Sequence, residues 1–248
     1  MLALLALAVA AAHAPADSTK YTVLNHGRPA GEMSVVSTAD SVVVRFRYQD
    51  RQRGPRFETI YRLGPNRRVL SMETRSVTPE GKLGDVTQRV DFWGDSLRSV
   101  SSGDTTLMRD DPTSYFVLDN TSPFDDARLA RFLLSRPQQT SRLYPVGTGH
   151  AEVVADTSVS VGGQPRHVRL VFVDGLATGA SSVWLDDSGG LFSSGAEWFI
   201  TVPREASGVL PALRAIEARI RAEKSAAVAR RLTPPAPRTL VVRNGNVF

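Results

Sequence analysis

Cysteine is absent from this chain of 248 residues. Its absence excludes disulfide bonds, thiolate metal ligands and cysteine nucleophiles, but it does not decide the compartment, because exported proteins can also lack cysteine. Histidine is scarce, with four residues in all, and the sequence has no His-x-His and no His-Glu-x-x-His motif. A Gly-x-Ser-x-Gly elbow and a Walker loop are also missing. No residue is therefore assigned a catalytic, metal-binding or cofactor-binding role.

Charge is moderate and spread along the chain. Lysine and arginine exceed aspartate and glutamate by 30 to 25, and 42% of the residues are hydrophobic, enough for a sizeable core. No cluster of basic residues is interleaved with aromatic residues, so nucleic acid is not an expected partner. The simplest interpretation places arginine on the wet faces of strands, and the alternative is an anionic partner.

The first residues resemble a secretory signal peptide. An apolar run over 1–12 is followed by Ala12-His13-Ala14, a small-x-small cleavage pattern, although the run has no lysine or arginine before it. The run is too short to span a bilayer, and no later segment is apolar enough. We therefore expect a signal over 1–14, export to the periplasm or the exterior, and no transmembrane span. The alternative is an apolar N-terminal helix that stays attached.

Period-two alternation dominates the chain that follows. The segment 41–48 places an apolar residue at every second position, with Arg45 and Arg47 between, and 56–63 sets Phe57, Tyr61 and Leu63 against arginine and glutamate in the same way. This pattern is typical of antiparallel strands with one face in water. Turn-forming sequences recur at 25–27, 53–55, 64–66, 79–81 and 102–104. We predict a mainly β (α+β) fold over 20–204, a large curved antiparallel sheet or half-barrel with one short helix and a long C-terminal helix.

Two helices are expected. The first covers 125–135 and is capped by Ser122 or Asp125. The second lies within 205–232 and carries an apolar stripe, with Glu217 and Arg221 on the opposite face as an i,i+4 pair. Three prolines within 233–237 predict a stiff linker, and 238–248 reads as a fresh strand. The acidic doublet at 186–187 is assigned to a turn.

Several phrases together resemble the N-terminal extension of exported amidohydrolase-superfamily proteins. The first is the turn Arg53-Gly54-Pro55, and the second is Trp184-Leu185-Asp186, which continues to Phe192 and Trp198. The terminal segment 238–248 is similar to the first strand of the amidohydrolase unit. These residues are structural markers of the resemblance, and none of them is a catalytic residue.

The resemblance implies an exported hydrolase with a β-rich front region, followed by a domain that is absent here. In such proteins a metal-dependent (β/α)8 barrel hydrolyses C–N bonds through a metal-bound water, with a zinc-like divalent ion. The expected partner is that downstream amidohydrolase domain in cis. We expect the front region to be structural or substrate-gating, with Trp184, Trp198 and Phe199 near the surface that packs against the barrel.

A different class of function also fits the sequence. A long antiparallel sheet wrapped around a helix is similar to periplasmic lipid or lipoprotein carriers, in which a concave sheet forms a cleft for a small-molecule or acyl ligand. In that alternative the long helix over 207–232 would fill the cleft. An enzyme acting through aspartate or histidine within this chain is a third hypothesis.

Overall fold

The computed structural model describes residues 17–233 except 52, 146, 177–178 and 197. The expected signal over 1–14 and the strand over 238–248 lie outside the described residues, as does the linker from residue 234 onward. None of the helices described combines the length and apolar composition that crossing a bilayer requires.

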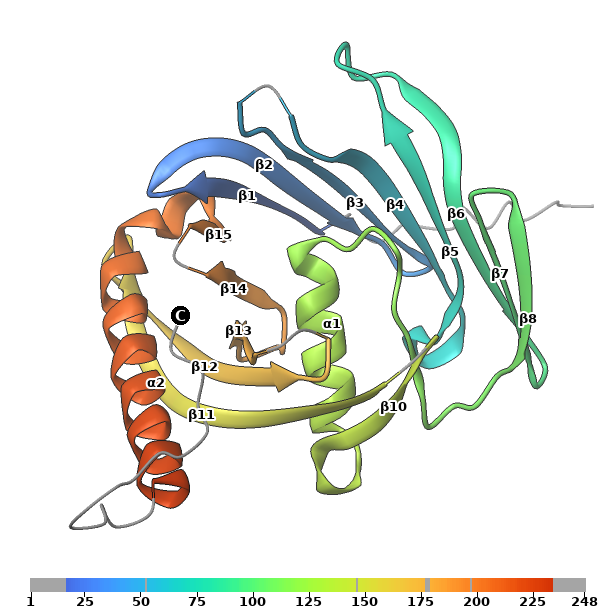
Figure 1. Cartoon of the computed structure of the whole chain (residues 1–248). Helices are drawn as coiled ribbons and strands as arrows, with labels where there is room; N and C mark the ends of the chain where they lie inside the picture. The colour runs from blue at the N-terminus through green and yellow to red at the C-terminus, as the bar shows by residue number, and fades with distance from the viewer. Residues whose placement is uncertain (1–16, 52, 146, 177–178, 197, 234–248) are drawn as a thin grey trace, which may run out of the picture.

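In the part of the chain that the structure describes, fifteen strands form one open, curved sheet (Figure 1). They cover Asp17–Asn25 (β1), Arg28–Ser37 (β2), Ser41–Tyr48 (β3), Arg56–Leu63 (β4), Val69–Val77 (β5), Leu83–Trp93 (β6), Ser96–Ser101 (β7), Asp104–Arg109 (β8), Tyr115–Phe116 (β9), Thr140–Tyr144 (β10), Thr148–Val161 (β11), Gln164–Asp174 (β12), Ser181–Asp186 (β13), Leu191–Ala196 (β14) and Phe199–Pro203 (β15). The predicted mainly β fold is confirmed, and each of the five turn signals falls between two strands.

The strand order is arranged around β1 at the middle of the sheet. β1 pairs with β2 on one side and with β15 on the other, so the first and last strands lie together at the centre. From there the order runs through β2 to β8 in one direction and through β14 to β9 in the other. All pairs are antiparallel except β9 and β10. Hairpin connections of this kind need only short turns, in agreement with the even spacing of turn signals.

Five helical segments accompany the sheet within the described residues. The two α-helices are α1 (Pro123–Leu134) and α2 (Leu210–Leu232), and three short 3₁₀ segments are η1 (Pro65–Arg67), η2 (Pro137–Gln139) and η3 (Arg204–Val209). Ser122 is the N-cap of α1 and forms a capping box with Asp125, which bonds both the backbone N–H and the hydroxyl of Ser122 at 2.9 Å. The predicted cap is therefore confirmed.

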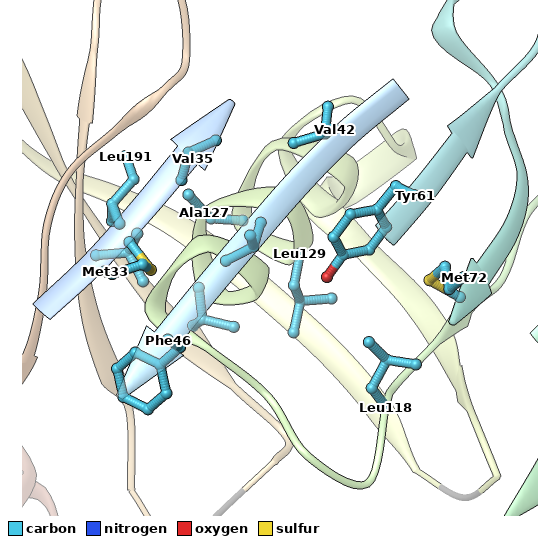
Figure 2. Close-up of a cluster of buried hydrophobic side chains, with 14 of the residues drawn as sticks. Met33, Val35, Val42, Phe46, Tyr61, Met72, Leu118, Ala127, Leu129 and Leu191 are labelled. Carbon is cyan, nitrogen blue, oxygen red and sulfur yellow. The ribbon is translucent and has the colours of Figure 1, made fainter. Parts of the chain in front are cut away.

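The concave face of the sheet is filled by α1. Ala127, Leu129 and Leu133 are buried against inward-facing side chains of the curved sheet, and Met33 and Phe46 are among the sheet residues that surround them (Figure 2). Each fully buried aliphatic or aromatic side chain contributes about 1.5–3 kcal/mol through the hydrophobic effect. The element that occupies the concave face is thus the short helix.

The outer face of β12 to β15 is covered by α2. Leu213 and Ile220 pack there with Leu170, Phe172 and other outward side chains of β12 to β15. The expectation that the long helix fills the concave cleft is therefore wrong. Its stripe is apolar like that of α1, but η3 directs α2 to the outer face directly after β15 (Figure 1).

A buried polar contact fixes α2 on the sheet. The indole Nε1 of Trp184 donates to Glu217 Oε1 at 2.6 Å, and Arg214 Nη1 donates to Glu217 Oε2 at 2.5 Å. Glu217 is 5% exposed, so the predicted solvent-facing pair with Arg221 is wrong. Arg221 instead donates to Ser182 Oγ at 2.7 Å. A buried carboxylate is tolerated here because two donors satisfy it.

Replacing Trp184 with alanine should lower the free energy of unfolding by about 3–5 kcal/mol, because the change leaves a large cavity and removes a donor from Glu217. Trp184 is fully buried, whereas Trp198 is 54% exposed. The matched control Trp198→Ala should change stability by less than about 1 kcal/mol. Urea unfolding of the two variants measures both values, and equal losses would contradict the anchoring role of Trp184.

Candidate functional site

A hollow lies at the end of the sheet where the β3–β4 connection meets the β14–β15 turn. Its volume is about 620 Å³, and we call it the Trp198 hollow. Its lining consists of Tyr48, Asp50, Arg51, Arg53, Gly54 and Trp198. Two phrases that carry the family resemblance, 145 positions apart between Arg53 and Trp198 (198 − 53), therefore contribute to one surface.

The shape of the β3–β4 connection depends on glycine at position 54. Asp50 and Arg53 exchange two backbone hydrogen bonds, of 2.7 and 2.8 Å, and Tyr48 N–H donates to Pro55 O at 3.0 Å. Gly54 has a φ of 147°, and a Cβ at this position would lie 2.1 Å from Tyr48 O. Only glycine allows the two backbones to approach so closely. The Arg-Gly-Pro phrase thus encodes a tight return of the chain.

Aromatic packing connects this turn with the β14–β15 turn. The Tyr48 and Phe199 rings lie 5.1 Å apart in an edge-to-face arrangement, and Trp198 lies 5.8 Å from Phe199. Such pairs contribute about 0.5–1.5 kcal/mol beyond their buried area. The carbonyl of Trp198 accepts from His26 N–H at 3.0 Å, while its indole stays exposed. The result is an exposed tryptophan on a rigid support.

The other residues of the resemblance lie elsewhere, inside the fold. Trp184 and Phe192 belong to the core beneath α2, and Leu185 belongs to the core around α1. Asp186 closes the β13–β14 turn, because its Oδ1 accepts from Gly190 N–H at 2.7 Å and from Ser188 Oγ at 2.6 Å. The turn predicted for the acidic doublet is confirmed. Trp184 is buried under α2 rather than at the outer packing surface that the resemblance implies.

A polar cluster is buried between α1 and the concave face of the sheet. Tyr61 donates a short hydrogen bond to Asp125, and the Arg128 guanidinium lies 4.2 Å from the centre of the Tyr61 ring. On the next position of α1, Asp126 Oδ2 accepts from Ser194 Oγ at 2.6 Å. Burial raises the pKa of Asp126 from its ordinary value of 3.8 to about 7. The sequence predicts a capping role for Asp125, but not the contact of Asp126 with β14.

Little open space remains beside this cluster. A cavity of about 10 Å³ is lined by residues of 115–118, by Asp125 and Asp126, and by Leu129 and Leu176. This volume holds about one water molecule. An acyl chain would enter the concave face only if α1 moved away from the sheet.

The histidines of the described region are separate from one another. His26 lies in the β1–β2 turn and His150 on β11, whereas His167 on β12 contacts Asp156 and Asp187 through its two ring nitrogens. These two carboxylates raise the pKa of His167. Among the described residues, no three His, Asp or Glu side chains come together in a geometry that holds a metal ion.

Comparison with protein families, curated proteins and solved structures finds none that matches this chain.

Replacing Gly54 with alanine should cost more than about 3 kcal/mol of folding free energy, since the new Cβ would overlap a backbone oxygen as well as strain φ. Gly81 in the β5–β6 turn is the matched control, because its φ is 83° and a Cβ at that position would have no neighbour within 4 Å. Gly81→Ala should therefore cost only about 1–2 kcal/mol. Thermal or urea unfolding compares the two, and the reverse order would contradict the close approach at Gly54.

The raised pKa of Asp126 predicts a specific dependence of stability on pH. Between pH 3.8 and about 7 the folded state keeps a proton that the unfolded chain releases, so this residue makes stability fall as pH rises through that window. Asp126→Asn removes the titration and keeps an acceptor for Ser194. Relative to the variant, the native protein should lose about 2 kcal/mol between about pH 5 and about pH 8, because the carboxyl keeps some solvent contact. Parallel stability profiles for both proteins would contradict this.

Proposed function

We propose that the described residues form the non-catalytic front module of an exported, metal-dependent hydrolase of amidohydrolase type. In this proposal a barrel domain downstream in the same chain holds the divalent metal ion and hydrolyses the C–N bond. The front module supports that domain, and it supplies no group to the reaction. The resemblance of the Arg-Gly-Pro and Trp-Leu-Asp phrases motivates the choice of family.

The observation that carries the proposal is the exposure of the second half of α2. The buried residues of this helix are Leu210, Leu213, Glu217 and Ile220, all in its first half. Every residue of 225–232, which we call the free arm, is exposed. The free arm continues a helix whose first half is already packed, and burying its exposed apolar side chains against a partner would add stability. Val228 and Leu232 lie one turn apart and present 45% and 68% of their surface to solvent.

The hydrogen-bond partners of three acidic residues also support a structural role. Asp125 caps α1, Asp186 closes a turn, and Glu217 joins α2 to the sheet. A general acid or base must reach a substrate through a cleft. These carboxylates are instead occupied by hydrogen bonds within the fold. The Trp198 hollow, with its exposed indole and Arg51 and Arg53, offers a second surface for the downstream domain.

A lipid-type carrier is the second candidate, and one observation favours it. The curved sheet encloses a single short helix, α1, on its concave face, the arrangement that a displaceable plug would have (Figure 1). Against this, the space beside α1 holds about one water molecule. Uptake of a fluorescent fatty acid, together with a change in the protection of the α1 backbone amides from hydrogen exchange, would favour the carrier over the front module.

The coding sequence beyond codon 248 gives the first test. We expect it to continue into a (β/α)8 pattern that begins with a His-x-His motif. Continuation without these features, or a stop codon, would overturn the proposal.

The free arm gives the second test, in the full-length protein. Val228→Asp combined with Leu232→Asp should weaken the contact between the two domains by about 1.5–3 kcal/mol for each apolar side chain, and should lower amide hydrolysis and the melting temperature of the catalytic domain. The matched control is Ala215→Asp with Ala218→Asp, which adds the same charge to exposed positions on the docked half of α2. Equal activity and equal melting of the two double variants would contradict a docking role.

A further inference from the structure

A groove on the outer face of the sheet concentrates positive charge. Its volume is about 440 Å³, and its floor is formed by outward side chains of β1 to β4 together with the start of η3. The cationic residues that line it are Lys20, Arg45, Arg47, Arg56 and Arg204. We call it the basic groove. It lies on the opposite face from the core around α1, because its polar residues alternate with the buried Met33, Phe46 and Phe57.

The strand register explains why these side chains converge. Across β2, β3 and β4, Glu32 pairs with Arg47, and Arg47 pairs with Arg56. In the neighbouring row, Ser34 pairs with Arg45, and Arg45 pairs with Glu58. Side chains directly opposite each other on one face of a sheet lie about 4.5–5.5 Å apart at Cβ. The register therefore places several guanidinium groups within reach of one bound group.

Carboxylates compensate this charge only in part. Glu58 contacts Arg45 at 2.5 Å, and Glu32 is shared between Arg47 at 3.2 Å and Arg204 at 3.6 Å. Arg56 donates to a neutral partner, the amide oxygen of Gln49, at 3.2 Å. Like charges directly opposite each other on a sheet destabilise it. The Arg47–Arg56 pair is such a contact, and a bound anion would relieve the repulsion.

The other wall of the groove is apolar. The end of the β5–β6 hairpin contributes Val77 of β5, Pro79 of the turn and Leu83 of β6, and Leu83 is 51% exposed. A site with a cationic floor and an apolar wall is complementary to a molecule that has both an anionic and an apolar part. Guanidinium groups bind phosphate through two parallel hydrogen bonds, and a phosphate monoester carries a charge of about −1.5 to −2 at neutral pH. The five cationic side chains match such a dianion better than a single carboxylate.

We propose that the basic groove binds an organic phosphate, with the phosphate on Arg47 and Arg56 and its apolar substituent against Leu83. The phosphate can belong to a free small molecule or to a lipid headgroup, since both present the same group. This site lies outside the surfaces of the proposed function, and its test does not depend on hydrolytic activity.

Titration calorimetry on the full-length protein, with phenyl phosphate and inorganic phosphate as probes, tests the site. Phenyl phosphate should bind at least about tenfold more tightly than inorganic phosphate, a difference of about 1.4 kcal/mol. Arg56→Gln should lower the affinity for both probes at least about tenfold. Leu83→Ser should weaken phenyl phosphate alone.

The matched control is Arg62→Gln, on the same strand and the same outer face as Arg56 but outside the basic groove. Equal weakening by Arg56→Gln and Arg62→Gln, or binding of neither probe, would overturn the proposal and leave a solvated basic surface. Co-sedimentation with vesicles distinguishes the sources. If the protein binds phosphatidylcholine vesicles that contain phosphatidic acid, and Arg56→Gln abolishes this binding, the ligand is a lipid headgroup. If the protein binds phenyl phosphate but not these vesicles, the ligand is a free phosphate.

Discussion

Strands β12 to β15 of this sheet are apolar on both faces, and the rest of the architecture depends on the need to cover both. On β12, Leu170 and Phe172 enter the core beneath α2, while Val171 and Val173 enter the core around α1. Antiparallel sheets commonly leave one face in water. Here a helix covers each face of β12 to β15, and the wet face lies on the other half of the sheet, on strands such as β3 and β4. The two helices therefore follow from one feature of the strands.

The fold could be predicted from the sequence wherever a local rule decides it. The period of 41–48 identifies β3, the turn signals separate the strands, and Ser122 with Asp125 marks the start of α1. Which helix covers which face could not be predicted, because both have apolar stripes and the choice depends on the path of the chain through η3. The helical pattern misplaces Glu217 on the wet side of α2 for a related reason. Its partner Trp184 lies 33 positions away on β13, and no helical pattern contains it.

The candidate site also depends on contacts between residues far apart in the sequence, which local patterns do not predict. A resemblance identifies Arg53, Gly54 and Trp198, yet their convergence requires the register from β3 through β2 and β1 to β15. The basic groove is even less visible in the sequence. Arginine at alternate positions of 41–48 indicates a wet face, which is correct, but the pattern does not show that the β5–β6 turn adds a wall to that face. Predicting a surface that is formed by strands far apart in the sequence requires the strand register as well as the hydrophobic period.

The ionisable side chains of the described region divide into two groups with different physical roles. Inside the fold, Asp125 and Glu217 each accept hydrogen bonds from two or more donors, which offset the cost of burying a carboxylate. On the outer face, Arg47 and Arg56 lie directly opposite each other. Glu58 shows that a carboxylate opposite an arginine fits this sheet, since it pairs with Arg45 one row away. Arg56 has a neutral partner, Gln49, where Arg45 has a carboxylate, so the charge of the Arg47–Arg56 pair is the less compensated of the two rows and is available to an anion.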